Sequence, residues 1–71
     1  MKFTLSNRQR QIFEFICRFY KENDLSPSIS EIASGNGMGV STVVSHLRAL
    51  EKKGYISKKA NIPRSIVPIK P

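Results

Sequence analysis

The sequence is poor in the residues on which several classes of protein depend. Among 71 residues it has no tryptophan, one cysteine (Cys17) and one histidine (His46). A lone cysteine excludes an internal disulfide, and so few Cys and His side chains argue against a zinc site, so we expect neither metal nor cofactor. No segment is apolar and long enough to cross a bilayer, and the N-terminus lacks the apolar core of a signal peptide. We therefore expect a protein of the reducing cytoplasm with no membrane partner and no evident small-molecule ligand.

Acidic residues are also scarce, and they are unevenly placed. The formal net charge is +7, and residues 41–71 hold seven of the 12 Lys and Arg residues but only Glu51 of the five acidic ones. A basic half of this kind is typical of a nucleic-acid binder. A chain of this length forms one domain, here residues 1–71, and has no room for a cleft between two lobes. Because it also lacks a nucleophile–base pair, we predict no enzymatic activity.

The first helix is predicted from a capping box. Ser6 and Gln9 have the required spacing, so the helix begins at Asn7. Apolar and aromatic residues then recur at helical spacing at positions 12, 13, 16, 19 and 20. We assign the aromatic rings to the core rather than to stacking on bases, because stacking requires exposed rings. Cys17 is expected simply to pack within this apolar helix.

The stretch from Glu31 to Gly54 organises the rest of the chain. A second capping box, Ser28 with Glu31, starts a short helix at 29–35, and a glycine-bearing turn leads to a longer helix at 40–53. The longer helix has an apolar stripe formed by Val43, Leu47 and Leu50.

The opposite face of the longer helix is small and hydroxylated at its start and basic towards its end. Its residues are Ser41, Thr42, Ser45, Arg48 and Lys52. This layout suits a DNA major groove, with short polar side chains near base edges and long cations near phosphates. The alternative is a helical hairpin whose outer face is only solvated.

Two short strands, at 55–59 and 64–67, and a turn at 60–63 are predicted after this helix. The predicted fold is therefore mainly α with a small β-hairpin: a winged helix-turn-helix, three helices followed by a two-stranded wing at 55–69. We predict that the longer helix, the wing and the start of the second helix contact the DNA backbone through Ser28, Lys52, Lys53, Lys58, Lys59 and Arg64. For Lys58 and Lys59, protection of an exposed strand edge explains the charges equally well. For Ser28 the alternative is a helix cap and nothing more, and the two roles are compatible. For Arg64 we favour DNA.

Several motifs occur together in a specific order: Leu5-Ser6, Arg8-Gln9, Ser26-Pro27-Ser28, Glu31-Ile32, Ser41-Thr42-Val43, His46-Leu47, Leu50-Glu51, Lys53-Gly54, Pro63-Arg64 and Ile66. This order resembles the N-terminal DNA-binding domain of LexA, the self-cleaving repressor of the bacterial DNA-damage response. The resemblance implies a winged helix-turn-helix that represses transcription by binding operator DNA. By position it implies base reading by Ser41, Thr42, Val44 and Ser45, and the layout of the helix adds Arg48.

The chain departs from the family in three respects: the turn, the second domain and the residues that face the groove. Gly37-Met38-Gly39 replaces the family's apolar-Gly pair and Asn36 is polar, so we expect Met38 to fill the gap that an apolar residue would occupy. The family's second domain, with its Ser/Lys self-cleavage chemistry and its dimer contacts, has no counterpart in these residues. The operator sequence is not carried over, because the residues that face the groove differ.

Two functions follow from these observations. The first is a regulator, a repressor by the resemblance, that binds double-stranded DNA at an inverted-repeat operator and is associated with the nucleoid. The second is a protein-interaction module, such as an anti-repressor, that does not read DNA directly; its active face should then be acidic. Because the sequence has no coiled-coil heptads and no spare helix, we expect a free monomer that pairs only on DNA.

Overall fold

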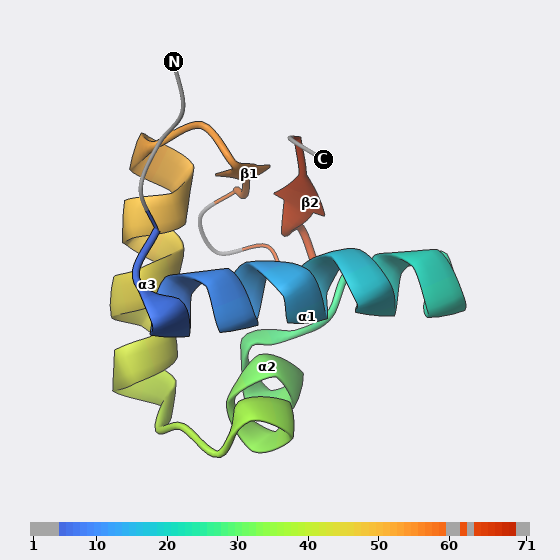
Figure 1. Cartoon of the computed structure of the whole chain (residues 1–71). Coiled ribbons are helices and arrows are strands. Elements are labelled where there is room, and N and C mark those ends of the chain that lie inside the picture. Colours follow the sequence, from blue (N-terminus) through green and yellow to red (C-terminus); the bar gives the residue numbers. More distant parts are fainter. Residues whose placement is uncertain (1–4, 60–61, 63, 70–71) are drawn as a thin grey trace.

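A computed structural model describes residues 5–59, 62 and 64–69 of the chain. The elements follow the predicted order: α1 (Asn7–Asn23), α2 (Ile29–Asn36), α3 (Val40–Lys52), β1 (Ile56–Ser57) and β2 (Val67–Pro68). In Figure 1, α1 runs across the molecule, α3 stands near its first turns, and α2 lies on the opposite side of α1 from the strands. The arrangement confirms the predicted mainly helical, winged helix-turn-helix fold.

Two serines start the first two helices, as predicted. Ser6 Oγ accepts a hydrogen bond from the Gln9 N–H at 3.1 Å, and Gln9 Oε1 accepts one from the Ser6 N–H at 3.2 Å. Ser28 and Glu31 form the same reciprocal pair, at 3.1 and 2.9 Å. Each pair satisfies N–H groups that the start of a helix leaves without intrahelical partners. At α3 the cap is Gly39, which supplies no side-chain hydrogen bond.

Left-handed glycines end the second and third helices. Gly37 after α2 has φ 64°, and Gly54 after α3 has φ 84°. The Gly54 N–H donates to the Glu51 carbonyl and the Tyr55 N–H to the Leu50 carbonyl, each at 3.0 Å. This pair of bonds is the Schellman arrangement, in which glycine avoids the steric cost that a Cβ has at positive φ. The predicted cap at Gly54 is confirmed, although α3 itself ends one residue earlier than predicted, at Lys52.

Hydrogen bonds at the end of α2 hold the turn between α2 and α3. The Met38 N–H donates to the Ala33 carbonyl at 3.0 Å, and the Met38 side chain packs half-buried against the core, as expected. Asn36 extends α2 one residue beyond its predicted end. Its amide donates to the Ile32 carbonyl at 2.7 Å and accepts from Gln11 at 3.1 Å. These hydrogen bonds satisfy the polar side chain of Asn36 at a position where a helix-turn-helix ordinarily buries an apolar residue.

The core draws on all three helices and the wing. Its buried apolar side chains are Ile12, Phe13, Ile16, Ile32, Ala33, Val43, Leu47, Leu50, Ile56 and Ile66. The predicted stripe of α3 is therefore confirmed. Phe19 and Tyr20, which we assigned to the core, are only half-buried, because the last turns of α1 project past the other helices (Figure 1). The Phe19 ring instead lies beside the Phe15 ring, with 6.0 Å between centroids.

The strands of the wing are shorter than predicted. Only Ile56 with Pro68 and Ser57 with Val67 pair, in antiparallel register. Beyond them Ser65 Oγ accepts from the Lys59 N–H at 3.0 Å. A side chain thus takes the place of the next ladder hydrogen bond, which is why the predicted strands at 55–59 and 64–67 were too long. Three residues of the predicted turn, 60, 61 and 63, lie outside the described residues.

Candidate nucleic-acid interface

The outer face of α3 carries most of the residues predicted to read bases. Ser41, Thr42, Ser45, Arg48 and Lys52 are all exposed, and Val44 is half-buried beside them. Within the part of the chain that the structure describes, none of the five exposed side chains makes a hydrogen bond or an ion pair. They are therefore available to an external partner. A helix of 13 residues is about 20 Å long, enough to lie across a major groove.

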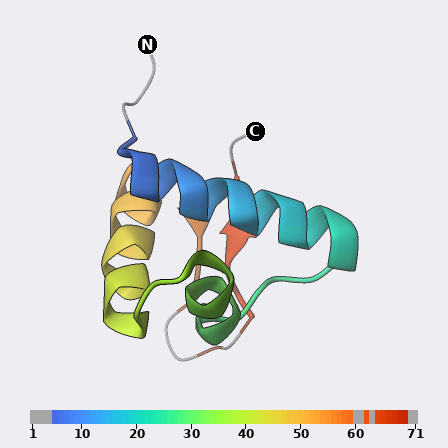
Figure 2. The same cartoon turned by 60° about the horizontal axis from the view of Figure 1, so that its bottom comes forward.

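The same helix is held in place by its other face. Val43, Leu47 and Leu50 are each 0% exposed. Figure 2 shows α2 and α3 joined by the turn, with α2 packed beneath α1. Full burial of each such side chain stabilises the fold by about 1.5–3 kcal/mol. Rotation of α3 about its axis would expose these side chains and lose this stabilisation. The orientation of the outer face is thus set by the core.

The structure brings Arg8 and His46 to this surface. Neither residue was among the predicted DNA contacts. An open hollow of about 300 Å³ lies between the start of α1 and the turn, and Arg8, Thr42 and His46 line it together with residues of the turn. Arg8 is exposed and His46 is half-buried. The sequence indicated only that Arg8 is exposed, because it lies off the apolar stripe of α1. No local pattern, however, connects residue 8 with residue 42.

The predicted backbone contacts fall into separate groups. Ser28, Lys58, Lys59 and Arg64 line one groove of about 390 Å³ between the start of α2 and the wing. Lys52 lies apart from it on the outer face of α3. Lys53 is half-buried, and its Nζ donates to Gln9 Oε1 at 3.1 Å. This bond joins the end of α3 to the cap of α1. The Ser28 hydroxyl accepts from the Glu31 N–H, so its role as a cap is occupied.

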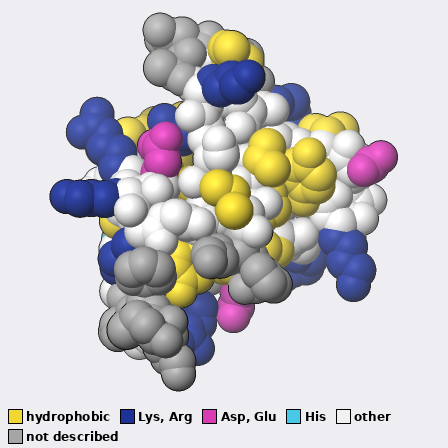
Figure 3. Space-filling model, turned by 90° about the horizontal axis from the view of Figure 1, so that it is seen from above, with side chains coloured by type: hydrophobic (Ala, Val, Ile, Leu, Met, Phe, Trp, Pro, Cys, Tyr) yellow, Lys and Arg dark blue, Asp and Glu magenta, His cyan; other side chains and the backbone are white. Residues whose placement is uncertain are grey.

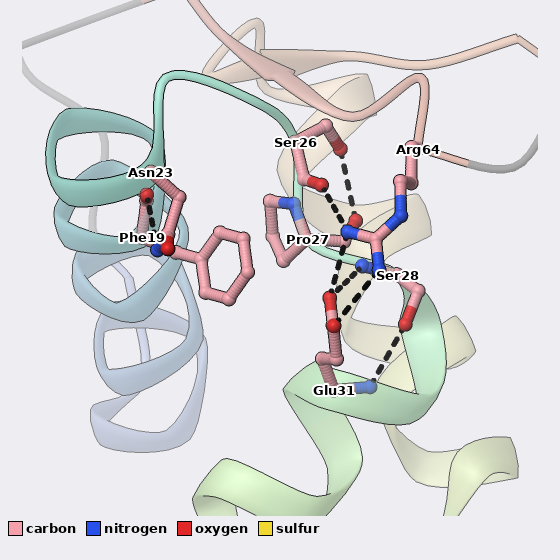
Figure 4. Close-up of polar contacts among 7 residues, drawn as sticks. All are labelled: Phe19, Asn23, Ser26, Pro27, Ser28, Glu31 and Arg64. Atoms are coloured by element: carbon pink, nitrogen blue, oxygen red, sulfur yellow. Dashed lines mark hydrogen bonds and ion pairs between the residues drawn. The ribbon is translucent and has the colours of Figure 1, made fainter.

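Arg64 has a partner within the chain. Its Nη1 and Nη2 donate to the two carboxylate oxygens of Glu31 at 3.0 and 2.9 Å, and Nη1 also donates to the Ser26 carbonyl at 2.9 Å (Figure 4). The guanidinium and carboxylate groups meet as two parallel hydrogen bonds, the strongest geometry for such a pair. Arg64 is held at φ 56°, in the left-handed region. The wing is therefore attached to the start of α2 by a polar contact, here called the wing latch.

Glu31 takes part in both the cap of α2 and the wing latch. Its pKa is lowered from the ordinary value, first by the hydrogen bond from Arg64 and then by the backbone hydrogen bond at Ser28. The pKa of Arg64 is raised by the same pair. Both groups are therefore charged at neutral pH. The sequence placed Ser28 with Glu31 but did not show that residue 64 would reach them.

The described residues offer neither a metal site nor a membrane-spanning helix. They contain no group of three or more His, Cys, Asp and Glu side chains placed to hold a metal ion. None of their helices has the length and apolar character needed to cross a membrane. Burial, and to a lesser degree the charge of Glu14, raise the pKa of the Cys17 thiol, so this half-buried cysteine is protonated at neutral pH.

Comparison with known proteins agrees with this geometry. The family model described as the LexA DNA binding domain matches residues 2–65. The chain belongs to the LexA DNA-binding domain family. Membership confirms the recognition made from the sequence motifs, and the family's description as a DNA binding domain agrees with the predicted binding of DNA.

Similar proteins include LexA repressors from three bacteria. The one from Koribacter versatilis is 40% identical over 68 residues, 94% of this chain and 32% of the relative. That from Caldicellulosiruptor saccharolyticus is 43% identical over 67 residues, 93% and 33%. That from Desulfitobacterium hafniense is 44% identical over 63 residues, 87% and 31%. The chain thus spans about a third of the length of the LexA repressors it matches.

Proposed function

We propose that this LexA DNA-binding domain represses transcription by binding an operator, with α3 in the major groove and the wing beside it. The observation that supports the proposal is the outer face of α3, where exposed hydroxyls and cations make no hydrogen bond or ion pair with any other described residue. This face is basic, whereas the alternative function, a protein-interaction module such as an anti-repressor, requires an acidic face. Regulation of transcription, rather than an enzymatic reaction, is the function that follows.

Base reading is assigned to Ser41, Thr42, Val44, Ser45 and Arg48. The first four lie in the first half of α3, where short side chains bring the helix close to base edges. A hydroxyl group accepts a hydrogen bond from, or donates one to, any base, and the Val44 methyl groups can pack against the methyl group of a thymine. Arg48 is long enough to bind guanine through two hydrogen bonds, the commonest specific contact.

Backbone contacts are assigned to Lys52, Lys53, Lys58 and Lys59, with Ser28 at the start of α2. The groove between α2 and the wing brings Ser28, Lys58 and Lys59 together, so one phosphate strand is within reach of all three. Roughly five to seven contacts for the domain correspond to a slope of log K against log salt of about −5 to −6. Arg64 reaches this strand only if its ion pair with Glu31 breaks, or if its guanidinium binds a phosphate and Glu31 at the same time.

Assembly on DNA follows from the size of the surface. A single domain of this kind buries roughly 600–1,000 Å² on DNA, which is small for tight specific binding. We propose that the domain is monomeric when free, binds one half-site weakly, and pairs by proximity on an inverted repeat. Nucleoid association follows from the salt-dependent, sequence-independent part of the binding.

Selection of bound duplexes from random DNA, followed by competition between the selected and random duplexes, tests the function. We expect an inverted-repeat motif and a salt slope near −5 for each domain bound. Replacing Thr42 with Glu should change the preferred sequence, whereas replacing Lys52 with Ala should weaken all duplexes alike. No enrichment, or a slope near zero between low and moderate salt, contradicts the proposal.

A further inference from the structure

An open groove lies along the face of α1 that carries residues 10, 14, 18 and 21. Its volume is about 610 Å³. Leu5, Phe13, Cys17 and Tyr55 form its apolar floor. The Phe13 and Tyr55 rings meet edge to face, with 5.2 Å between centroids and 82° between planes. Edge-to-face packing of two aromatic rings stabilises the pair beyond simple burial, so the floor is a fixed surface.

The rim of the groove is cationic. Arg10, Arg18 and Lys21 are exposed, and Glu14 is the one carboxylate among the lining residues. Within the described part of the chain these three cations make no side-chain hydrogen bond or ion pair. They are therefore not used by the fold. Figure 3 views the molecule from the end where α3 finishes and shows hydrophobic side chains gathered on that side of the molecule, with Lys and Arg side chains, and some Asp and Glu side chains, around its edges.

The groove is separate from the DNA-reading surface. Ser41, Thr42 and Ser45 lie in the first half of α3, beside α2, whereas Tyr55 follows the other end of α3. Figure 1 shows these two ends of α3 on opposite sides of α1. A phosphate backbone would pair with the cations of the rim but would leave the apolar floor without an apolar partner. A second duplex is therefore a poor fit.

The spacing of the cations indicates the shape of an occupant. Arg10 and Lys21 are separated along α1 by 11 positions, about 17 Å. A small anion reaches a cation only within about 4 Å, so it cannot meet both ends of the rim. A helix of about three turns lying along α1 has the right length, with apolar residues at helical spacing over the floor and carboxylates on either side. A second copy of this domain would bring one cationic rim against another, which is repulsive.

We propose that this groove docks an acidic amphipathic helix of a partner protein, so that the domain binds a co-regulator while α3 remains on DNA. The floor takes the partner's apolar side chains, and Arg10, Arg18 and Lys21 pair with its carboxylates. Interaction through one short helix is weak, so we expect a Kd of about 100 µM at low salt.

The probe is a synthetic peptide of about three helical turns with capped ends, leucines on one face and glutamates beside them. A control peptide has the same composition in shuffled order. NMR of the isotopically labelled full chain should show amide shifts at residues 10–21 and Tyr55 with the first peptide and none at residues 41–45. The peptide should also slow alkylation of Cys17, whose half-buried thiol lies in the floor.

Matched charge reversals test the rim. Arg18→Glu with Lys21→Glu should weaken peptide binding roughly tenfold. Arg48→Glu with Lys52→Glu makes the same change in net charge on α3 and should leave peptide binding within about twofold. All four side chains are exposed, and the amide spectra of both variants should show that they fold.

Several results would overturn the proposal. One is equal weakening by the two double variants, and another is equal binding of the shuffled peptide. A third is peptide-induced shifts confined to α3, which would make the peptide a phosphate mimic. A fourth is binding to anionic phospholipid vesicles that depends on Arg18 and Lys21 while the peptide does not bind, which would replace the protein helix with a membrane surface.

Discussion

Helix α3 and the wing are attached to the rest of the domain by different kinds of contact. The α3 stripe is apolar and fully buried at Val43, Leu47 and Leu50. The wing has a ladder of two residue pairs, two buried apolar anchors at Ile56 and Ile66, and polar contacts at its base. Apolar burial depends little on pH and salt, whereas a partly exposed ion pair depends on both.

The difference separates the two elements proposed to contact DNA in their response to pH and salt. Helix α3, which we propose reads the bases, keeps its orientation as long as the core is intact. The wing depends in addition on Arg64, on Glu31, and on the Ser26 hydroxyl, which accepts from the Ile66 N–H at 3.0 Å. We therefore expect sequence preference to be robust and the backbone contribution of the wing to be adjustable.

The largest expected effect comes from the apolar attachment. Leu47→Ala should lower the free energy of unfolding by about 3 kcal/mol, because it removes a fully buried side chain and leaves a cavity. Urea denaturation measures this change. Ser45→Ala on the outer face of the same helix is the control and should change stability by less than about 0.5 kcal/mol. Similar losses in the two variants would mean that the faces of α3 have been assigned wrongly.

Replacement of glycine by serine should have opposite effects on stability at two positions of the turn before α3. Gly37→Ser should cost about 1–2 kcal/mol, because φ is 64° there and a side chain is strained at that value. Gly39→Ser should stabilise by about 0.5–1 kcal/mol, because it supplies the hydroxyl cap that α3 lacks. An added Cβ meets no atom within 4 Å at either position. Thermal unfolding of the two variants checks the signs, and a loss of stability in both contradicts the cap assignment.

Loss of a cation from α3 and loss of the cation of the wing latch should affect DNA binding differently. Lys52→Ala should weaken binding to all duplexes several-fold and reduce the salt slope by about one. Arg64→Ala should weaken binding with little change in slope, because its guanidinium is already paired with Glu31. Fluorescence anisotropy over a range of salt concentrations measures both quantities. A slope reduced by about one in Arg64→Ala would instead support the direct DNA contact predicted from the sequence.

The smallest effect is the pH dependence of the wing latch. The pKa of Glu31 is lowered in the folded state, so its ionised form stabilises the fold above its ordinary pKa, near 4.5. That stabilisation is lost as the pH falls through the lowered folded value. Glu31→Gln retains a residue suited to the capping box but not the charge pair. It should therefore be less stable than the parent at neutral pH and equal to it in acid. Melting curves from neutral to acidic pH check this, and identical profiles would exclude the pair as a source of stability.

The sequence alone determined the helices and their boundaries to within one residue wherever we predicted them. The starts of α1 and α2 depend on capping pairs three residues apart, Ser6 with Gln9 and Ser28 with Glu31. The buried face of α3 follows from apolar residues at helical spacing. These features are local, because each rests on residues within one or two helical turns of one another. The length of the strands was predicted less well, since Ser65 replaces a ladder bond from outside the strands.

Only the tertiary structure decided which distant residues meet. Arg64 reaches Glu31 across 33 positions of sequence, and Arg8 lies near Thr42 because α1 packs on α3. Gly35 was predicted as the last residue of the second helix. In the structure the Phe15 ring lies against it so closely that a Cβ there would be 2.5 Å from Cε2. A pattern in the sequence reports which face of an element is apolar. The partner of that face, and the groove between α1 and Tyr55, depend on how separate elements pack, and no residue spacing encodes this directly.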